Sequence, residues 1–188
     1  VRTGCLLFID WGASVTNTEG NIGKYLSQLS SKSGGKYKYA EKFVEYLRYY
    51  GIDGIGFNPE GTWQGSLQTQ VKGFLAECHR VAEQKGWPFH VDWYAFVNNN
   101  GKLTDSGSAL TSDCNTWFME ESTGTPVTDV YMLNYNWSEA GLSTSVETAK
   151  AAGGNTFDVY AGFDQQGRGY GRYGNAGWKA LMKYPVSI

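Results

Sequence analysis

The chain has 188 residues, a formal net charge of −2 and 15% aromatic residues. Phosphate binding needs clustered cations, so a near-neutral chain without a run of Lys or Arg argues against a nucleic-acid partner. The low charge excludes a disordered acidic or basic tail, and no stretch of about 18 apolar residues is present to cross a bilayer. From composition alone, the many Trp and Tyr residues fit a large aromatic core better than a site that stacks hydroxyl-rich ligands.

The cysteines and the chain ends bear on the class of protein. Cys5, Cys78 and Cys114 form no C-x-x-C pair and have no nearby His pattern. We therefore expect neither a zinc site nor a disulfide scaffold, and no cofactor. The chain starts at Val1 without a Met, almost inside an apolar segment, and ends inside another. We interpret it as a piece of a longer protein.

Apolar runs alternate with helical patterns along the chain. The runs lack polar alternation, which is typical of parallel strands buried on both faces. Strands are expected at 4–10, 52–58, 89–96, 129–134 and 157–163, with another beginning at 186–188. Helices are expected at 39–50, 66–85, 143–152 and 175–183, and a polar, flexible loop at 30–36. This alternation predicts an α/β fold with a parallel sheet.

The ends of the expected strands favour a barrel over a doubly wound nucleotide-binding sheet. No glycine-rich phosphate pattern follows the first strand, where Asp10 and Trp11 stand instead. Polar or aromatic residues also follow later strands, at 58–60, 92–94, 134–137 and 164–165. Functional groups at the carboxyl ends of many strands are typical of a (β/α)₈ TIM barrel. Because a barrel needs eight strands, we expect residues 1–188 to form a partial catalytic barrel that needs the rest of its own chain to close.

One carboxylate stands out at the end of the second expected strand. Strand side chains alternate with a period of two, so Gly56, Asn58 and Glu60 share one face. Glu60 is a candidate to protonate a glycosidic oxygen, and Asn58 is a candidate to hydrogen-bond a substrate amide. On the residues alone, a loop carboxylate beside a strand-end cap is an equally good interpretation.

Four sequence blocks, in order, carry a resemblance to glycoside hydrolase family 85, the endo-β-N-acetylglucosaminidases. Residues 50–54 (Tyr-Gly-Ile-Asp-Gly) leading to 58–60 (Asn-Pro-Glu) are similar to the family's Tyr-Gly-Phe-Asp-Gly and Asn-x-Glu. Residues 92–95 (Asp-Trp-Tyr-Ala) and 133–137 (Leu-Asn-Tyr-Asn-Trp) resemble two of its strand ends. Residues 158–169 resemble Asp-Val-Tyr-x-Gly-x-Asp-x-x-Gly-Arg-Gly, the most specific block.

The resemblance implies a place for each strand in the barrel. In the family, Asn-x-Glu ends the fourth strand. That makes 4–10 the third strand and 186–188 the start of the eighth, with two strands before Val1. The chain departs from the family at Ala95, where an acidic residue is usual, and it lacks the Trp-Gln-Asn segment that follows. These departures bear on which glycan is preferred.

The resemblance also implies a reaction. The substrate is the chitobiose core of an N-linked glycan, cut between its two GlcNAc units with net retention. Glu60 is the acid and then the base, and Asn58 orients the 2-acetamido group that attacks the anomeric carbon. Tyr94 hydrogen-bonds the same group. A sugar acceptor in place of water gives transglycosylation.

The remaining candidate residues are expected to bind substrate. Trp93, Asn134 and Trp137 are candidates for the walls of the sugar site, although barrel packing is an equal alternative for Trp93. Asp164 and Arg168 bind hydroxyl groups or, as we slightly prefer, form an ion pair that fixes their loop. Candidates for the donor sites at the end of the first strand are Asp10 and Trp11.

Two other functions compete with this one. A family 18 chitinase has a similar Asp-Gly to Glu spacing, but it carries Asp where Gly56 and Asn58 stand. A non-catalytic carbohydrate-binding barrel would keep the Trp residues and lose the acid. For the compartment, we favour an exported bacterial enzyme, extracellular or periplasmic, over a cytoplasmic one.

Overall fold

The computed structural model describes residues 3–9, 21–59, 66–94, 98–100, 108–114, 127–164, 166 and 174–188. Within these residues, one parallel sheet contains β1 (Gly4–Ile9), β4 (Gly54–Pro59), β5 (His90–Tyr94), β6 (Val130–Leu133) and β7 (Val159–Ala161). The helices are α1 (Asn21–Leu29), α2 (Ala40–Tyr49), α3 (Ser66–Gln84), α5 (Glu139–Ala151) and α7 (Gly174–Lys183), with a short 3₁₀ helix η1 (Thr156–Asp158). A small hairpin pairs β2 (Lys32–Ser33) with β3 (Lys36–Tyr37).

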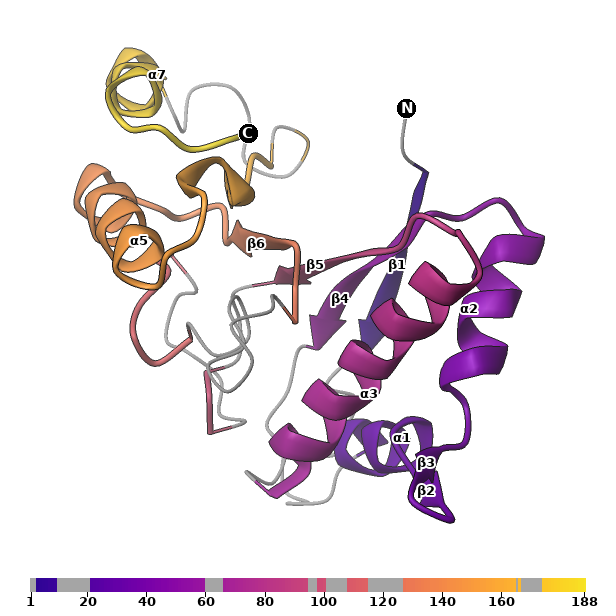
Figure 1. The fold of residues 1–188 in the computed structure, drawn as a ribbon. Helices are drawn as coiled ribbons and strands as arrows, with labels where there is room; N and C mark the ends of the chain where they lie inside the picture. The colour runs from indigo at the N-terminus through magenta and orange to yellow at the C-terminus, as the bar shows by residue number, and fades with distance from the viewer. Residues whose placement is uncertain are drawn as a thin grey trace.

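The strands of the sheet stand side by side in the order of the chain, β1-β4-β5-β6-β7 (Figure 1). A doubly wound sheet reverses its strand order at a switch point, whereas a (β/α)₈ barrel does not. A further strand begins beside β7, where Ser187 exchanges backbone hydrogen bonds of 2.9 Å with Val159 and Ala161. The expected strand start at 186–188 is therefore confirmed.

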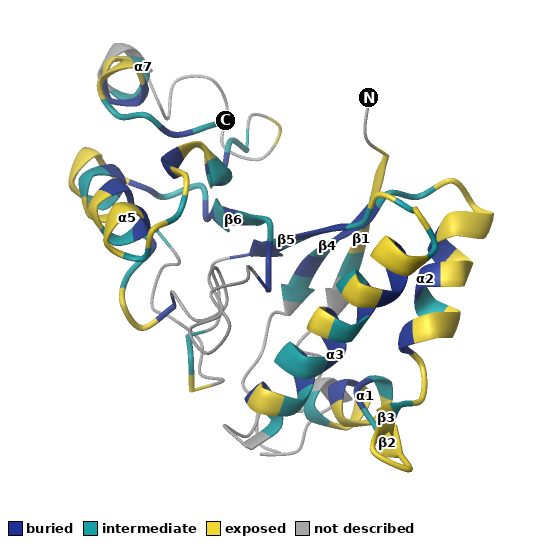
Figure 2. Ribbon diagram, in the orientation of Figure 1, coloured by how far each residue is buried: buried dark blue, intermediate teal, exposed yellow. Residues whose placement is uncertain are grey.

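The two faces of the sheet have different roles. The outer face carries large apolar side chains that are almost fully buried, among them Phe57, Trp93 and Tyr131. They belong to the same core cluster as the buried stripes of α2 and α3, which include Leu47 and Phe74. Figure 2 shows these helices with buried residues on one side and exposed residues on the other. This amphipathic pattern is what holds the helices against the sheet.

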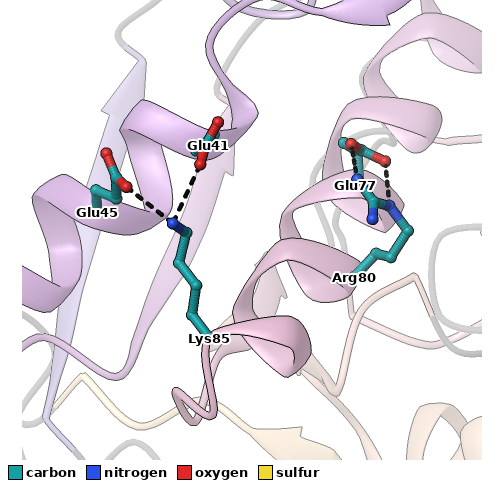
Figure 3. A network of polar contacts seen from close by, with 5 residues as sticks. All are labelled: Glu41, Glu45, Glu77, Arg80 and Lys85. Carbon is teal, nitrogen blue, oxygen red and sulfur yellow. Dashed lines mark hydrogen bonds and ion pairs between the residues drawn. The ribbon is translucent and has the colours of Figure 1, made fainter.

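Ion pairs accompany this packing at the surface. Lys85, just after α3, reaches Glu41 at 3.1 Å and Glu45 at 2.8 Å, both on α2 (Figure 3). Within α3, Arg80 pairs with Glu77 through two hydrogen bonds. These contacts link exposed side chains, so they contribute little to stability beside the apolar core.

Most of the predicted elements are confirmed, with shifted bounds. The largest shift is in α5, which begins at Glu139 rather than at 143. Ser138 explains it, because its hydroxyl accepts a 3.1 Å hydrogen bond from the Gly141 N–H and caps the helix. The predicted flexible loop at 30–36 is wrong, since this segment contains the β2–β3 hairpin. Its turn places Gly34 and Gly35 at φ of 56° and 80°, as the tight turns that join hairpin strands require.

Candidate active site

The carboxyl ends of β4 and β5 bring two predicted catalytic residues to the same face of the sheet. Phe57 pairs with Trp93 in the register, so the next residue of each strand, Asn58 and Tyr94, lies on the opposite, inner face. Asn58 is half-buried and Tyr94 is 7% exposed. A carboxamide and a phenol hydroxyl thus stand on neighbouring strands at the barrel end where such enzymes keep their active sites.

Trp93 lies on the other face. It is completely buried, and its ring stacks on Phe57 with 5.0 Å between centroids and an angle of 10° between planes. Its register partner on β6 is Tyr131, which is also completely buried. This position favours the packing alternative for Trp93 over the wall of a sugar site.

The ends of β6 and β7 are held together by Trp137 and Gly162. The Trp137 indole N–H donates a 2.9 Å hydrogen bond to the Gly162 carbonyl, and the ring meets Phe163 edge-on at 5.6 Å. Trp137 is 8% exposed, so most of its surface is used in this packing. Asn134 lies at the same end of the sheet, directly after β6. Its side-chain oxygen accepts a 2.7 Å hydrogen bond from the Tyr135 N–H. The role of Asn134 and Trp137 in sugar binding stays a prediction.

The other predicted site residues divide into two groups. Asp164 is described, half-buried and three residues after the end of β7, at the same end of the sheet as Asn58 and Tyr94. Four predicted residues lie outside the described part of the chain: Asp10, Trp11, Glu60 and Arg168. The proposed pair of Asp164 with Arg168 and the proposed acid therefore rest on the sequence.

Burial shifts the pKa of groups that belong to the core. It raises the pKa of the Cys78 thiol in α3 and of the Tyr131 hydroxyl in β6 well above their ordinary values. Both groups are completely buried and stay protonated at neutral pH. Their perturbation has a structural cause, so a strongly shifted pKa does not by itself mark the active site of this protein.

Sequence reasoning overlooked two residues near Asn58 and Tyr94. Tyr135 lies beside Tyr94, with ring centroids 6.4 Å apart and an angle of 39° between the ring planes. Asp92 precedes Tyr94 by two residues in β5 and shares its inner face. Side chains of a strand alternate between its two faces, which placed Asn58 and Glu60 on one face. The same alternation, counted back from Tyr94, identifies Asp92.

Taken together, sequential parallel strands, covering helices and polar residues at the carboxyl ends define part of a (β/α)₈ barrel of the kind that enzymes use. The profile of Glycosyl hydrolase family 85 matches residues 11–187. The chain therefore belongs to this family. The predicted family and the predicted fold class are both confirmed.

Two relatives show how much of such a protein the chain covers. "Cytosolic endo-beta-N-acetylglucosaminidase" of Danio rerio is 28% identical over 152 residues, which are 79% of this chain and 20% of the relative. The crystal structure of the glycoside hydrolase domain of Endo-D from Streptococcus pneumoniae R6 matches with a TM-score of 0.73 and 25% identity. That match covers 86% of this chain and 25% of the other. The chain thus spans a fifth to a quarter of the length of these relatives.

Proposed function

We propose that the chain is part of the catalytic barrel of an endo-β-N-acetylglucosaminidase. Its substrate is the N-linked glycan of a glycoprotein or glycopeptide, cut in the GlcNAc-β1,4-GlcNAc core. The single observation that carries the proposal is the placement of Asn58 and Tyr94 on one face at the carboxyl ends of adjacent strands. The family match over residues 11–187 and the Danio rerio relative support the same activity.

The proposed mechanism is retaining and uses the substrate's own N-acetyl group. Glu60, two residues after Asn58, gives its proton to the glycosidic oxygen as the bond to the anomeric carbon breaks. The acetamido oxygen attacks that carbon and forms an oxazolinium ion, in which the nitrogen keeps its proton. Asn58 accepts a hydrogen bond from the acetamido N–H, and the Tyr94 hydroxyl donates to the same group. The contact with Asn58 stabilises the positive charge that develops on the acetamido group in the transition state, and the contact with Tyr94 orients that group.

The second step returns the enzyme to its starting state. Water attacks the anomeric carbon of the oxazolinium ion, and the Glu60 carboxylate takes a proton from the water. The ring opens, the acetamido group is restored, and the configuration at the anomeric carbon is retained. A sugar hydroxyl in place of water gives transglycosylation by the same route.

The proposal is tested with two substrates and one pair of variants. The full-length protein should release glycan from a high-mannose glycopeptide and leave a chitin oligomer intact; the reverse result would indicate a chitinase. Binding without cleavage would indicate a carbohydrate-binding barrel. Glu60→Gln should lower glycopeptide hydrolysis by about 10²-fold or more while glycan binding remains, on the scale of a positioned acid. Normal turnover of this variant would remove Glu60 from the mechanism.

Asn58→Ala distinguishes the substrate-assisted mechanism from a carboxylate nucleophile. The variant should hydrolyse natural glycans poorly but still use a preformed sugar oxazoline, because that donor has already passed the step that Asn58 assists. With an acceptor sugar it should accumulate product. Mass spectrometry of the wild-type protein after incubation with a 2-fluoro sugar donor tests for the alternative, a carboxylate nucleophile. A stable adduct on an Asp or Glu would exclude the proposed mechanism.

A further inference from the structure

The strands of the described sheet contain one carboxylate, Asp92 in the middle of β5. The strands β1, β4, β6 and β7 contain no Asp, Glu, Lys, Arg or His, and β5 contains one further such residue, His90. Asp92 pairs with Gly56 on β4 and with Val130 on β6, neither of which is titratable. Asp92 is therefore the one carboxylate that the described strands of this sheet carry.

The neighbours of Asp92 along β5 occupy the same inner face. His90, which is 9% exposed, lies on the side away from the active site, with its Nε2 atom 3.9 Å from Oδ2 of Asp92. Tyr94 follows on the side of the active site. The Asp92 side chain is 41% exposed, so it is not part of the core between the sheet and the helices. Asp92 therefore stands between a buried imidazole and the proposed catalytic residues.

The register brings Asp92 close to Asn58. Its partner on β4 is Gly56, and Asn58 is two residues further along the same face, which makes it the diagonal neighbour of Asp92. Diagonal neighbours on one face of a sheet lie about 7–8 Å apart, with their Cβ atoms somewhat closer, so two side chains that turn toward each other can meet. Because Gly56 has no side chain, it places no atoms of its own between the two groups. Leu6 covers Gly56 from β1, with Cδ1 3.3 Å from the position of a Cβ.

We propose that Asp92 is a positioning residue for Asn58, an inference that rests on the function proposed above. Its carboxylate accepts a hydrogen bond from the Asn58 side-chain NH₂. A carboxylate only accepts, whereas a carboxamide has a donating and an accepting end of similar shape. Asp92 therefore selects one of the two orientations of the carboxamide. The Asn58 oxygen is then directed toward the substrate, where it accepts from the acetamido N–H.

The test compares two substrates in the full-length protein. Asp92→Asn keeps the shape of the side chain but can donate as well as accept, so it no longer selects the orientation of Asn58. We expect kcat on a glycopeptide to fall about 10-fold to 100-fold, the scale of a misplaced group, with little change in KM. Transfer from a preformed sugar oxazoline should stay near the wild-type rate. A structural defect would lower both activities alike, and that result would overturn the proposal.

A double-mutant cycle gives a second, independent readout. If Asp92 acts only through Asn58, the double variant Asp92→Asn/Asn58→Ala should hydrolyse glycopeptide no more slowly than Asn58→Ala alone. If the fold-losses in glycopeptide hydrolysis of the two single variants instead multiply in the double variant, the proposal would be overturned. Glu45→Gln is the matched control, since it removes an exposed carboxylate on the outer surface and should leave both activities unchanged. Asp92→Ala gives the same comparison if Asp92→Asn fails to fold.

The outcomes separate this inference from the proposed function. A wild-type protein that cleaves the glycopeptide, with Asp92→Asn equally active, overturns the role of Asp92 and leaves the proposed function standing. A wild-type protein that uses neither glycopeptide nor oxazoline overturns both. Loss of glycopeptide hydrolysis with retained oxazoline transfer supports both.

Discussion

The contact at Gly54 shows how a single residue sets the spacing of two strands. Gly54 begins β4 and pairs with His90, the first residue of β5. A Cβ atom at position 54 would lie 2.5 Å from Nδ1 and 2.6 Å from Cγ of the imidazole, and would also meet the His90 carbonyl oxygen. The Asp-Gly of the first family block is thus explained by close approach of a neighbouring strand. The close pairing of Gly54 with His90 also limits where the imidazole next to Asp92 can lie.

Gly54→Ala should therefore be destabilising. Because backbone as well as side-chain atoms of His90 must move, we expect the free energy of unfolding to fall by about 1–3 kcal/mol, the usual cost of overpacking. Urea denaturation measures it. Gly23→Ala is the control, since nothing lies within 4 Å of its Cβ position in α1, and it should raise the free energy of unfolding by up to about 1 kcal/mol. Equal stability of the two variants would contradict the close approach.

At the scale of elements, apolar packing rather than ion pairing holds α2 and α3 together. Phe74 is 1% exposed, and its ring lies 5.9 Å from that of Phe43 on α2 and 6.2 Å from that of Tyr37 in β3. Phe74 therefore links α3 to α2 and to the β2–β3 hairpin. The Lys85 contacts with α2 lie at the edge of this packing, where water and salt screen them.

Substitutions at these two positions should differ sharply. Phe74→Ala should lower the free energy of unfolding by about 3–5 kcal/mol, because it removes a buried ring and leaves a cavity. Lys85→Met should change the unfolding midpoint far less, and its small effect should shrink further at high salt. Chemical denaturation at two salt concentrations measures both. A larger loss for Lys85→Met than for Phe74→Ala would show that the ion pairs dominate.

The elements that the sequence predicted share strong periodic signals. In α3, Val71, Phe74, Leu75 and Cys78 recur at helical spacing, so both its existence and its start at Ser66 were predictable. Two elements were missed. In α1, Ile22, Tyr25, Leu26 and Leu29 recur at helical spacing, so this short helix was predictable from its pattern but was overlooked. The strands of the hairpin have two residues each, too few for any alternation to show.

The candidate site was predictable in part, for a related reason. Local spacing identified Asn58 and the family blocks identified Tyr94. Spacing within one strand does not show which of its residues face the same side as those of the neighbouring strand. The sequence therefore could not decide whether Trp93 packs in the core or binds sugar. The register between β4 and β5 answers that question, because it pairs Trp93 with Phe57 on the outer face. The same register places Asp92 opposite Gly56 and diagonal to Asn58, which the family block over residues 92–95 does not reveal.

At the scale of the whole molecule, the sheet separates stability from chemistry by face. The outer face packs on the helices and is almost completely buried, as at Phe57, Trp93 and Tyr131. The inner face carries glycines and polar groups, including Gly56, Asn58 and Asp92. Because the strands run parallel and in order, their carboxyl ends meet at one end of the molecule (Figure 1). The described residues of the proposed mechanism, Asn58 and Tyr94, both lie on the inner face.

Two adjacent residues of β5 test this separation directly. Tyr94→Phe removes the hydroxyl that orients the acetamido group at the inner face, so kcat on glycopeptide should fall about 10²-fold, the scale of a misplaced reacting group. Its unfolding midpoint should barely change. Trp93→Leu removes a buried, stacked ring from the outer face and should lower the free energy of unfolding by about 2–4 kcal/mol. Its kcat per folded molecule, measured well below the melting temperature, should stay near that of the wild type. If Trp93→Leu instead lost sugar binding while keeping its stability, Trp93 would be a wall of the sugar site, and the assignment of the two faces would be wrong.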